Sequence, residues 1–320
     1  MHTCYTDWAY LVDLRQLDYF RHVAELGSFT RAATFLSVVQ PALSRQVRQL
    51  ETELGQTLFE RNGRGVALTE AGTRLLEHTR GILTQIARAR QDLEDQRNGD
   101  SGHVALGLPP SLGRSVTVPL VTAFRRILPN ANLVTVEGLS TYMLEWLSMG
   151  RIDGALVYNA SAAPALELTP LLDEQLFLVA PRNRPRGARP PAARKSISLS
   201  ELAEHPLIIP SRPHAMRMSI ENALAQVGRK ITVAHEIECI PAVIDLVRQG
   251  HGYAVLPMHA VRSTQWWDEV RLLPVLRPTL STPLSIATSS QRPKSPLMRK
   301  AIEVIREVVA REVHATGIAA

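Results

Sequence analysis

Cysteine is scarce in this chain of 320 residues, which contains only Cys4 and Cys239. Two isolated cysteines provide no disulfide framework, and neither has another cysteine nearby or belongs to a group of cysteines and histidines at the spacing of metal ligands. We therefore expect no metal and no cofactor. We interpret Cys239 as a reduced, packed thiol rather than a redox centre.

Long apolar runs and secretion signals are also lacking. No segment approaches the roughly 18 uninterrupted apolar residues of a membrane-spanning helix. Residues 1–13 lack a basic start followed by an apolar stretch. The sequence therefore predicts a cytoplasmic protein without a membrane partner.

Catalytic motifs are missing as well. The chain has no Gly-x-Ser-x-Gly turn, no phosphate-binding Gly-Lys-Ser/Thr loop and no His-x-x-x-His pair. The histidines are scattered, and we interpret His214 and His251 as surface or loop residues. We therefore do not expect an enzyme.

The net charge of +6 is weak evidence for a nucleic-acid partner. Six basic residues that equal this excess lie together, without an acidic residue between them, in a segment rich in proline and alanine: Arg182, Arg184, Arg186, Arg189, Arg194 and Lys195. We interpret this segment as a solvated loop. DNA binding must therefore be argued from a site.

Three short helices are predicted near the N-terminus. Gly27 can end the first helix, Ser28 can cap the second, and Gln40 opens a third that has Pro41 in its first turn. An apolar stripe on the third helix is formed by Leu43, Val47, Leu50 and Leu54. The opposite side and leading end carry Gln40, Pro41, Ser44, Arg45 and Arg48. This pattern predicts a helix-turn-helix with one packed face and one free face.

A two-stranded wing and a long helix are predicted next. Residues 58–68 place a glycine-rich turn between two short apolar segments, with Arg61 and Arg64 at its tip. Thr69 can cap the long helix. Its apolar residues alternate by four and three positions, which predicts a seam for a partner helix: Leu75, Thr79, Ile82, Ile86, Ala89 and Leu93.

Beyond the breakers at 98–102 the pattern changes to short β-type runs that alternate with helices, which is typical of an α/β domain. Strands are expected at 104–108, 133–137, 154–158, 175–180, 207–210, 231–237, 253–257 and 284–288. Helices are expected through 121–128 and at 141–149, 216–226, 240–249 and 296–313.

Four motifs stand out between residues 27 and 72: Gly27-Ser28-Phe29-Thr30-Arg31-Ala32-Ala33, Gln40-Pro41-Ala42-Leu43-Ser44-Arg45, Leu58-Phe59-Glu60-Arg61 and Leu68-Thr69-Glu70-Ala71-Gly72. Together these motifs resemble the DNA-binding domain of LysR-type transcriptional regulators. Less specific sequence motifs of the family follow at 150–155 and 250–257. Within the family, the chain resembles the nitrogen-assimilation-control branch.

The resemblance implies three regions. A winged helix-turn-helix occupies 12–72, a dimerising linker helix 73–98, and an effector-binding domain 103–320. The last is expected to resemble a periplasmic binding protein, with lobe one at 103–173 and 277–320 and lobe two at 174–276. The effector is expected between the lobes.

Site residues also follow from the resemblance. Gln40, Pro41 and Arg45 are expected at base edges, and Ser44, Arg48, Arg61 and Arg64 at phosphates. Arg48 could instead pair with Glu51 or Glu53. Effector contacts are expected from Pro110, Ser111, Ser140, Thr141, Ser211, Arg212, Cys239 and Ile240. Hydroxyls at helix starts suit an anion, with Arg212 as a possible counter-charge. The alternative is that the serine and threonine residues at these helix starts are plain helix caps.

Two departures from the family pattern matter. Residues 1–11 precede the usual family start, and we expect this extension to be absent from the native protein. Val39 stands where many relatives have serine or threonine, and valine cannot cap a helix.

The predicted function is therefore a sequence-specific transcriptional regulator. Its expected partners are an interrupted palindrome in double-stranded promoter DNA, a small effector, a second copy in a dimer or tetramer, and RNA polymerase. A solute receptor is the alternative, because the second region resembles solute-binding proteins.

Overall fold

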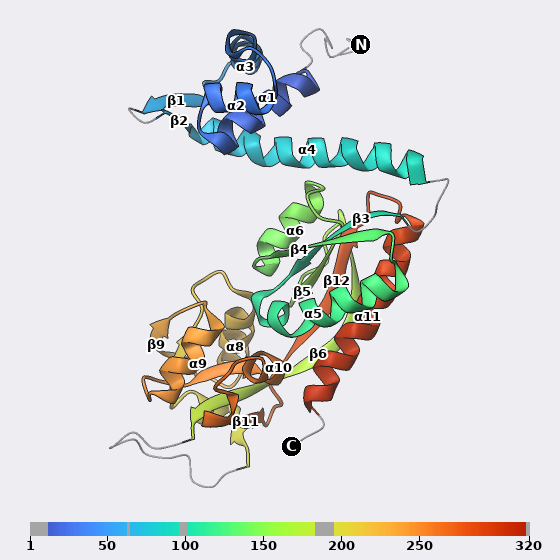
Figure 1. Ribbon diagram of the computed structural model, residues 1–320. Helices are drawn as coiled ribbons and strands as arrows, with labels where there is room; N and C mark the ends of the chain where they lie inside the picture. The colour runs from blue at the N-terminus through green and yellow to red at the C-terminus, as the bar shows by residue number, and fades with distance from the viewer. Residues whose placement is uncertain (1–11, 63–64, 96–100, 183–194, 318–320) are drawn as a thin grey trace, which may run out of the picture. The chain divides into compact units, whose positions relative to one another are not determined.

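The computed structural model describes residues 12–62, 65–95, 101–182 and 195–317, and the chain divides into two units (Figure 1). The first unit is Met1–Gln91 with Met149–Arg151, and the second is the remainder. The predicted extension at 1–11, Arg64 at the wing tip and most of the basic segment at 182–195 lie outside the described residues.

The first unit is a winged helix-turn-helix followed by a long helix. Its elements are α1 (Leu14–Leu26), α2 (Phe29–Phe35), α3 (Gln40–Leu54), β1 (Phe59–Asn62), β2 (Gly65–Leu68) and α4 (Glu70–Asp95). The predicted boundary signals are confirmed: Gly27 ends α1 with φ 61°, and the Ser28 side chain accepts a hydrogen bond from the Arg31 amide. Thr69 likewise caps α4 by accepting from the Gly72 amide at 3.0 Å.

The core of the helix-turn-helix lies where α1, α2 and α3 meet. Val23, Ala32, Ala33, Leu43 and Val47 are all buried there. Ala32 and Ala33 let α2 approach its neighbours closely, because larger side chains at a crossing hold helices apart. The predicted stripe on α3 is thus largely confirmed, although its last member is 37% exposed.

The wing is fixed against the turn between α1 and α2. The Val66 amide donates to the Gly27 carbonyl at 3.3 Å. A Cβ on Gly65 would lie 2.8 Å from that same carbonyl oxygen, and Gly65 has φ 147°. Glycine is therefore required where the second wing strand begins.

The second unit is built on one eight-stranded mixed sheet and a small two-stranded sheet. Strands of the large sheet run in the order β4-β3-β5-β12-β6-β11-β7, with β10 also paired to β6. The strands are β3 (Gly102–Leu108), β4 (Ala131–Glu137), β5 (Gly154–Tyr158), β6 (Leu166–Pro181), β7 (Ile197–Ser198), β8 (Pro206–Ile209), β9 (Thr232–Glu236), β10 (Ala254–Pro257), β11 (Val270–Leu276) and β12 (Ser281–Ser289). The helices are α5 (Pro110–Ile127), α6 (Ser140–Ser148), α7 (Leu199–Leu202), α8 (Ala215–Gln226), α9 (Ile240–Arg248), α10 (Met258–Arg262) and α11 (Pro296–Gly317).

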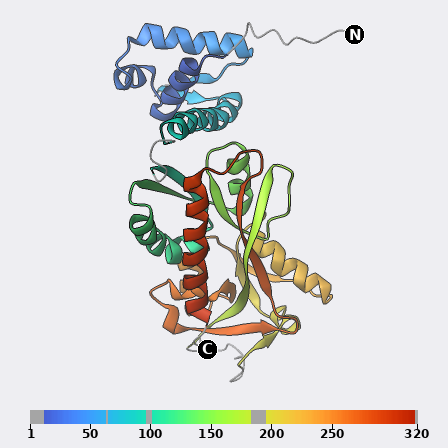
Figure 2. The ribbon, with the colours of Figure 1, turned by 90° about the vertical axis from the view of Figure 1, so that its right-hand side faces the viewer.

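Strand β6 belongs to both lobes of this unit. Its first part, through Gln175, pairs with β12, and from Leu176 onward it pairs with β10 and β11. Figures 1 and 2 show β6 and β12 running side by side through the unit. The strand predicted at 175–180 is therefore the second part of a longer strand that joins the lobes.

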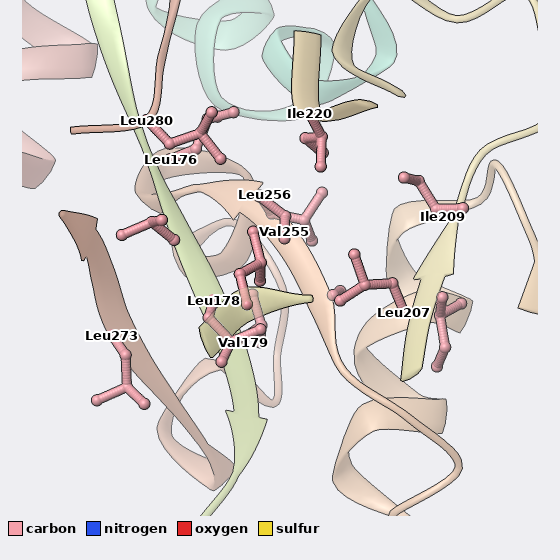
Figure 3. Close-up of a cluster of buried hydrophobic side chains, with 14 of the residues drawn as sticks. Leu176, Leu178, Val179, Leu207, Ile209, Ile220, Val255, Leu256, Leu273 and Leu280 are labelled. Carbon is pink, nitrogen blue, oxygen red and sulfur yellow. The ribbon is translucent and has the colours of Figure 1, made fainter. Parts of the chain in front are cut away.

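Each lobe has its own apolar core. In lobe two, leucines and valines of β6 meet those of β8, β10 and β11, as Figure 3 shows for Leu178, Val255 and Leu207. In lobe one, α5 and α11 pack together against the sheet. No helix among the described residues is both long and apolar enough to cross a membrane.

The other predicted strands and helices are present, with ends shifted by a few residues, except that α5 begins at Pro110, well before the predicted 121–128. Five elements of the described residues were not predicted: β7, β11, α7, α10 and a short 3-10 helix at Trp267–Glu269. Four of these five have five residues or fewer, which is too few to show a period. Strand β11 contains Pro274, a residue that argues against a strand.

Candidate DNA-reading helix and effector cavity

Helix α3 presents its polar side to solvent. Gln40, Pro41, Arg45 and Arg48 are exposed, and Ser44 is half-buried. The Gln40 side-chain amide donates to the Ser44 hydroxyl at 2.8 Å, so these two residues lie together one turn apart. The predicted base-facing residues and the two predicted phosphate-facing residues of α3, Ser44 and Arg48, thus lie on the polar side of this helix.

The arginines of α3 are available for a partner. Glu51, an alternative partner for Arg48, instead accepts hydrogen bonds from the Leu58 and Phe59 amides at 2.8 and 3.3 Å and so holds the wing to α3. Glu53, the other alternative, accepts from Gln49 at 2.9 Å. Among the described residues, neither Arg45 nor Arg48 forms an ion pair.

The wing arginines are described less completely. Arg61 lies on β1, in register with Val66 of β2. Its side chain and the whole of Arg64 lie outside what the structure describes. Their predicted phosphate contacts therefore stay predictions.

Helix α4 carries part of the predicted dimer seam on its surface. Ile82 is 41% exposed, Ile86 is half-buried and Ala89 is exposed. Thr79 is fully buried within the chain, so its placement in the seam was wrong. An exposed isoleucine on a long helix indicates a surface that a partner can cover.

The second unit contains a cavity of about 80 Å³ between its two lobes. Lobe one contributes Pro109, Pro110, Ser111, Leu139, Ser140, Thr141 and Tyr158. Lobe two contributes Ile208, Pro210, His214, Ala215, Met216, Ile237, Glu238, Ile240, Val243, Val255 and Leu256. The lining is mostly apolar, with hydroxyls gathered on the lobe-one side.

Five of the eight predicted effector residues line this cavity: Pro110, Ser111, Ser140, Thr141 and Ile240. Ser211, Arg212 and Cys239 are not part of the lining. Arg212 is instead paired with Glu221 at 2.6 Å, so the expected counter-charge is engaged elsewhere. Cys239 is exposed, and its interpretation as a packed thiol was wrong.

Helix N-termini from both lobes converge on the cavity. Helices α5, α6, α8 and α9 begin at Pro110, Ser140, Ala215 and Ile240, which all line it. At α5 and α9 no side chain caps the first turn. Each N-terminus carries a partial positive charge of about half an elementary charge. Glu238 opposes this field, but it is exposed and therefore screened by solvent.

His214 is a loop residue, as expected, but it also has a structural role at the cavity that the sequence did not reveal. It lines the cavity and caps α8, because its Nδ1 accepts from the Met216 amide at 3.2 Å. Burial lowers the pKa of His214, and the negative charge of Glu238 acts in the opposite direction. The neutral ring therefore carries its proton on Nε2 while Nδ1 accepts.

A buried polar chain that the sequence did not reveal lies behind the cavity. The Tyr158 hydroxyl donates to Glu174 on β6 at 2.6 Å, and the same carboxylate also contacts the Nδ1 of His259 on α10. All three side chains are buried. Burial, followed by the negative charge of Glu174, raises the pKa of Tyr158 well above 10.0, while a hydrogen bond with Ser111 acts in the opposite direction. Tyr158 therefore remains a donor at neutral pH.

The described residues contain no cluster of three His, Cys, Asp or Glu side chains placed to hold a metal ion. A helix-turn-helix with a wing, a long helix and a two-lobed α/β domain with a cavity together define a ligand-responsive DNA-binding regulator.

Comparison with known proteins gives the family. Residues 14–73 match the model described as "Bacterial regulatory helix-turn-helix protein, lysR family", and residues 97–310 match the "LysR substrate binding domain". The chain therefore belongs to the LysR family and is a LysR-type transcriptional regulator with a DNA-binding and an effector-binding domain.

Two curated relatives are nitrogen assimilation regulatory proteins nac. The protein of Klebsiella aerogenes is 33% identical over 94% of this chain and 96% of its own length, and that of Escherichia coli K12 is 31% identical over 94% and 97%. The resemblance to this branch is confirmed.

Solved structures support the fold over nearly the whole chain. CbnR, a LysR family transcriptional regulator, is 24% identical, with a TM-score of 0.71 over 92% of this chain and 99% of its own. CbnR has also been solved with its target DNA. A full-length OxyR variant from Pseudomonas aeruginosa is 24% identical, with a TM-score of 0.67 over 93% and 98%.

Proposed function

We propose that this regulator reads promoter DNA with the exposed side of α3 and responds to a small ligand with an apolar body and one anionic end. The convergence of four helix N-termini and two serine hydroxyls on one largely apolar cavity is the observation that carries the ligand class. Family membership favours this function over that of a solute receptor.

For DNA, the argument rests on charge and geometry. Arg45 offers a forked donor that suits guanine, and Gln40 offers an amide that suits adenine. Both are exposed near the start of a helix whose opposite side is buried. In helix-turn-helix proteins the N-terminal residues of this helix contact base edges. Arg48, Arg61 and Arg64 are proposed to contact phosphates, which carry no sequence information.

Assembly completes the proposal. A dimer formed through the exposed part of α4 would present two copies of α3 to the two halves of an interrupted palindrome. We further propose pairing of dimers into tetramers, contact with RNA polymerase at the promoter, and action in the cytoplasm, where that DNA is found.

The DNA part is tested with Arg45→Ala and, as a matched control, Arg15→Ala, which removes an exposed arginine from α1. A site selected from a random duplex library and an unrelated duplex are compared by gel retardation. Arg45→Ala should lose about tenfold or more in preference for the selected site, because a bidentate base contact discriminates by about 1 to 3 kcal/mol. Equal weakening on both duplexes would refute base reading by Arg45.

The ligand part is tested by filling the cavity from its rim. Thr141 lines the cavity but is exposed, so Thr141→Trp should occupy the space without disturbing a core. Ser148→Trp, at the exposed far end of the same helix, is the control. Small carboxylates and sulfonates, screened by thermal shift, should bind the control and the parent protein but not Thr141→Trp. Unchanged binding to Thr141→Trp would place the ligand elsewhere.

A further inference from the structure

Val39 is an anomaly in the first unit. It is the residue before α3, where a polar side chain would stabilise the helix start by about 0.5 to 2 kcal/mol. In α1, α2 and α4 of the same unit, Asp13, Ser28 and Thr69 each accept a hydrogen bond from a first-turn amide. At α3 no side-chain cap bond exists.

Val39 does not contribute to packing either. Its side chain is 70% exposed, whereas its neighbour Val38 packs against the core of the helix-turn-helix. Phe35, the other exposed apolar side chain near this turn, has a ring partner, with its centroid 5.1 Å from that of His22. An apolar residue that neither caps nor packs breaks the local rules of folding, and such breaks are expected at functional positions.

The position of Val39 suggests its partner. It directly precedes Gln40 and Pro41 at the leading end of α3, the end that enters the major groove in helix-turn-helix proteins. Adjacent Cα atoms lie about 3.8 Å apart, so a helix end that brings Gln40 to a base edge also brings Val39 into the same part of the groove. Val39 can therefore contact the same base pair as Gln40 or the one next to it.

We infer that Val39 is a specificity residue that contacts the 5-methyl group of a thymine in the major groove. Thymine is the base that offers an apolar group there, and an aliphatic side chain recognises it by excluding water from both surfaces. This inference rests on the proposal that α3 enters the major groove. The inference adds Val39 to the residues that recognise bases, at a position where a serine or threonine would instead cap the helix.

The test replaces thymine by deoxyuridine, which lacks only the methyl group, at each position of the selected site in turn. The full-length protein should lose about fourfold in affinity per half-site at one thymine, because burying one methyl group is worth about that factor. Val39→Ser should bind thymine and deoxyuridine equally at that position. Pro41 can also contact a methyl group, and any thymine that it reads should stay sensitive in Val39→Ser.

A second measurement separates base reading from a role in folding. Val39→Ser supplies the missing cap, so amide exchange in the first turn of α3 should become slower while base discrimination falls. If Val39 were needed only for structure, Val39→Ser would instead make amide exchange in the first turn of α3 faster and leave base discrimination unchanged. Thr34→Ser, which removes an exposed methyl group from α2, is the matched control and should change neither result.

Three results would overturn the inference. They are no thymine sensitivity in the parent protein, the same sensitivity in Val39→Ser, or an equal loss of affinity by Val39→Ser on thymine and deoxyuridine duplexes. In each case Arg45→Ala tests the underlying proposal separately. If Arg45→Ala still loses preference for the selected site, reading by α3 stands and only the role of Val39 fails.

Discussion

Removal of the Tyr158 hydroxyl should destabilise the effector-binding domain without creating a cavity. Tyr158→Phe deletes one oxygen, which donates at 2.6 Å to the buried carboxylate of Glu174. A hydrogen bond to a charged group is worth about 1.5 to 3 kcal/mol, and a carboxylate that loses a partner inside a protein has no water to replace it. We therefore expect the free energy of unfolding to fall by about 2 kcal/mol.

Urea unfolding of the full-length protein, followed by tryptophan fluorescence, measures this loss. Three of the four tryptophans, Trp146, Trp266 and Trp267, lie in the second unit, so most of the signal reports on that unit. With a urea dependence of about 2 to 3 kcal/mol per molar, the midpoint should fall by nearly 1 M. Tyr142→Phe, which removes the hydroxyl of a tyrosine that is 48% exposed, should leave the midpoint unchanged.

A double-mutant cycle sharpens the result. If the hydroxyl acts through the carboxylate, Tyr158→Phe should cost much less in a Glu174→Gln background, where no buried charge depends on it. Additive losses, or an unchanged midpoint for Tyr158→Phe, would refute the argument that Tyr158 stabilises a buried charge.

Two further perturbations test other parts of the chain. Ile82→Asp should abolish dimers in sedimentation velocity yet leave the helical circular dichroism of the chain intact, because Ile82 is 41% exposed on α4; an unchanged assembly would exclude this surface as the dimer interface. His214→Asn should reduce the loss of thermal stability between pH 7 and pH 5. Because burial depresses the pKa of His214 below 6.5 in the folded chain, its contribution is present above that value and is lost as the pH falls through the folded pKa. Asparagine caps without titrating, so an identical pH profile in the variant would show that His214 does not contribute.

The winged helix-turn-helix was predictable because its signals are local. Gly27, Ser28 and Thr69 define helix ends within a few residues of the bonds that they make, and the wing turn is marked by its own glycines. The helix period places Leu43 and Val47 in the core without any knowledge of distant segments.

The cavity was only partly predictable because its parts are remote in sequence. The hydroxyl groups of Ser111 and Ser140 come shortly after the ends of β3 and β4, and these two residues were expected from the family pattern. Tyr158, Glu174 and His259 come from three segments, and their sequence separations of 16 and 85 residues carry no periodic signal. Arg212 was misplaced because a basic residue after a strand does not reveal that Glu221 will pair with it.

The buried polar chain also indicates how an occupied cavity can affect the rest of the domain. Tyr158 lines the cavity, and its partner Glu174 lies on β6 just before the strand leaves β12 for β10 and β11. His259, the other partner of Glu174, lies on α10, which contacts both α5 and α11 of lobe one. A ligand that displaces Tyr158 therefore acts where the lobes join. Such a ligand can shift the domain only by its difference in affinity for two arrangements, which is typically worth about 1 to 3 kcal/mol. We therefore expect a rearranged footprint on DNA rather than complete release.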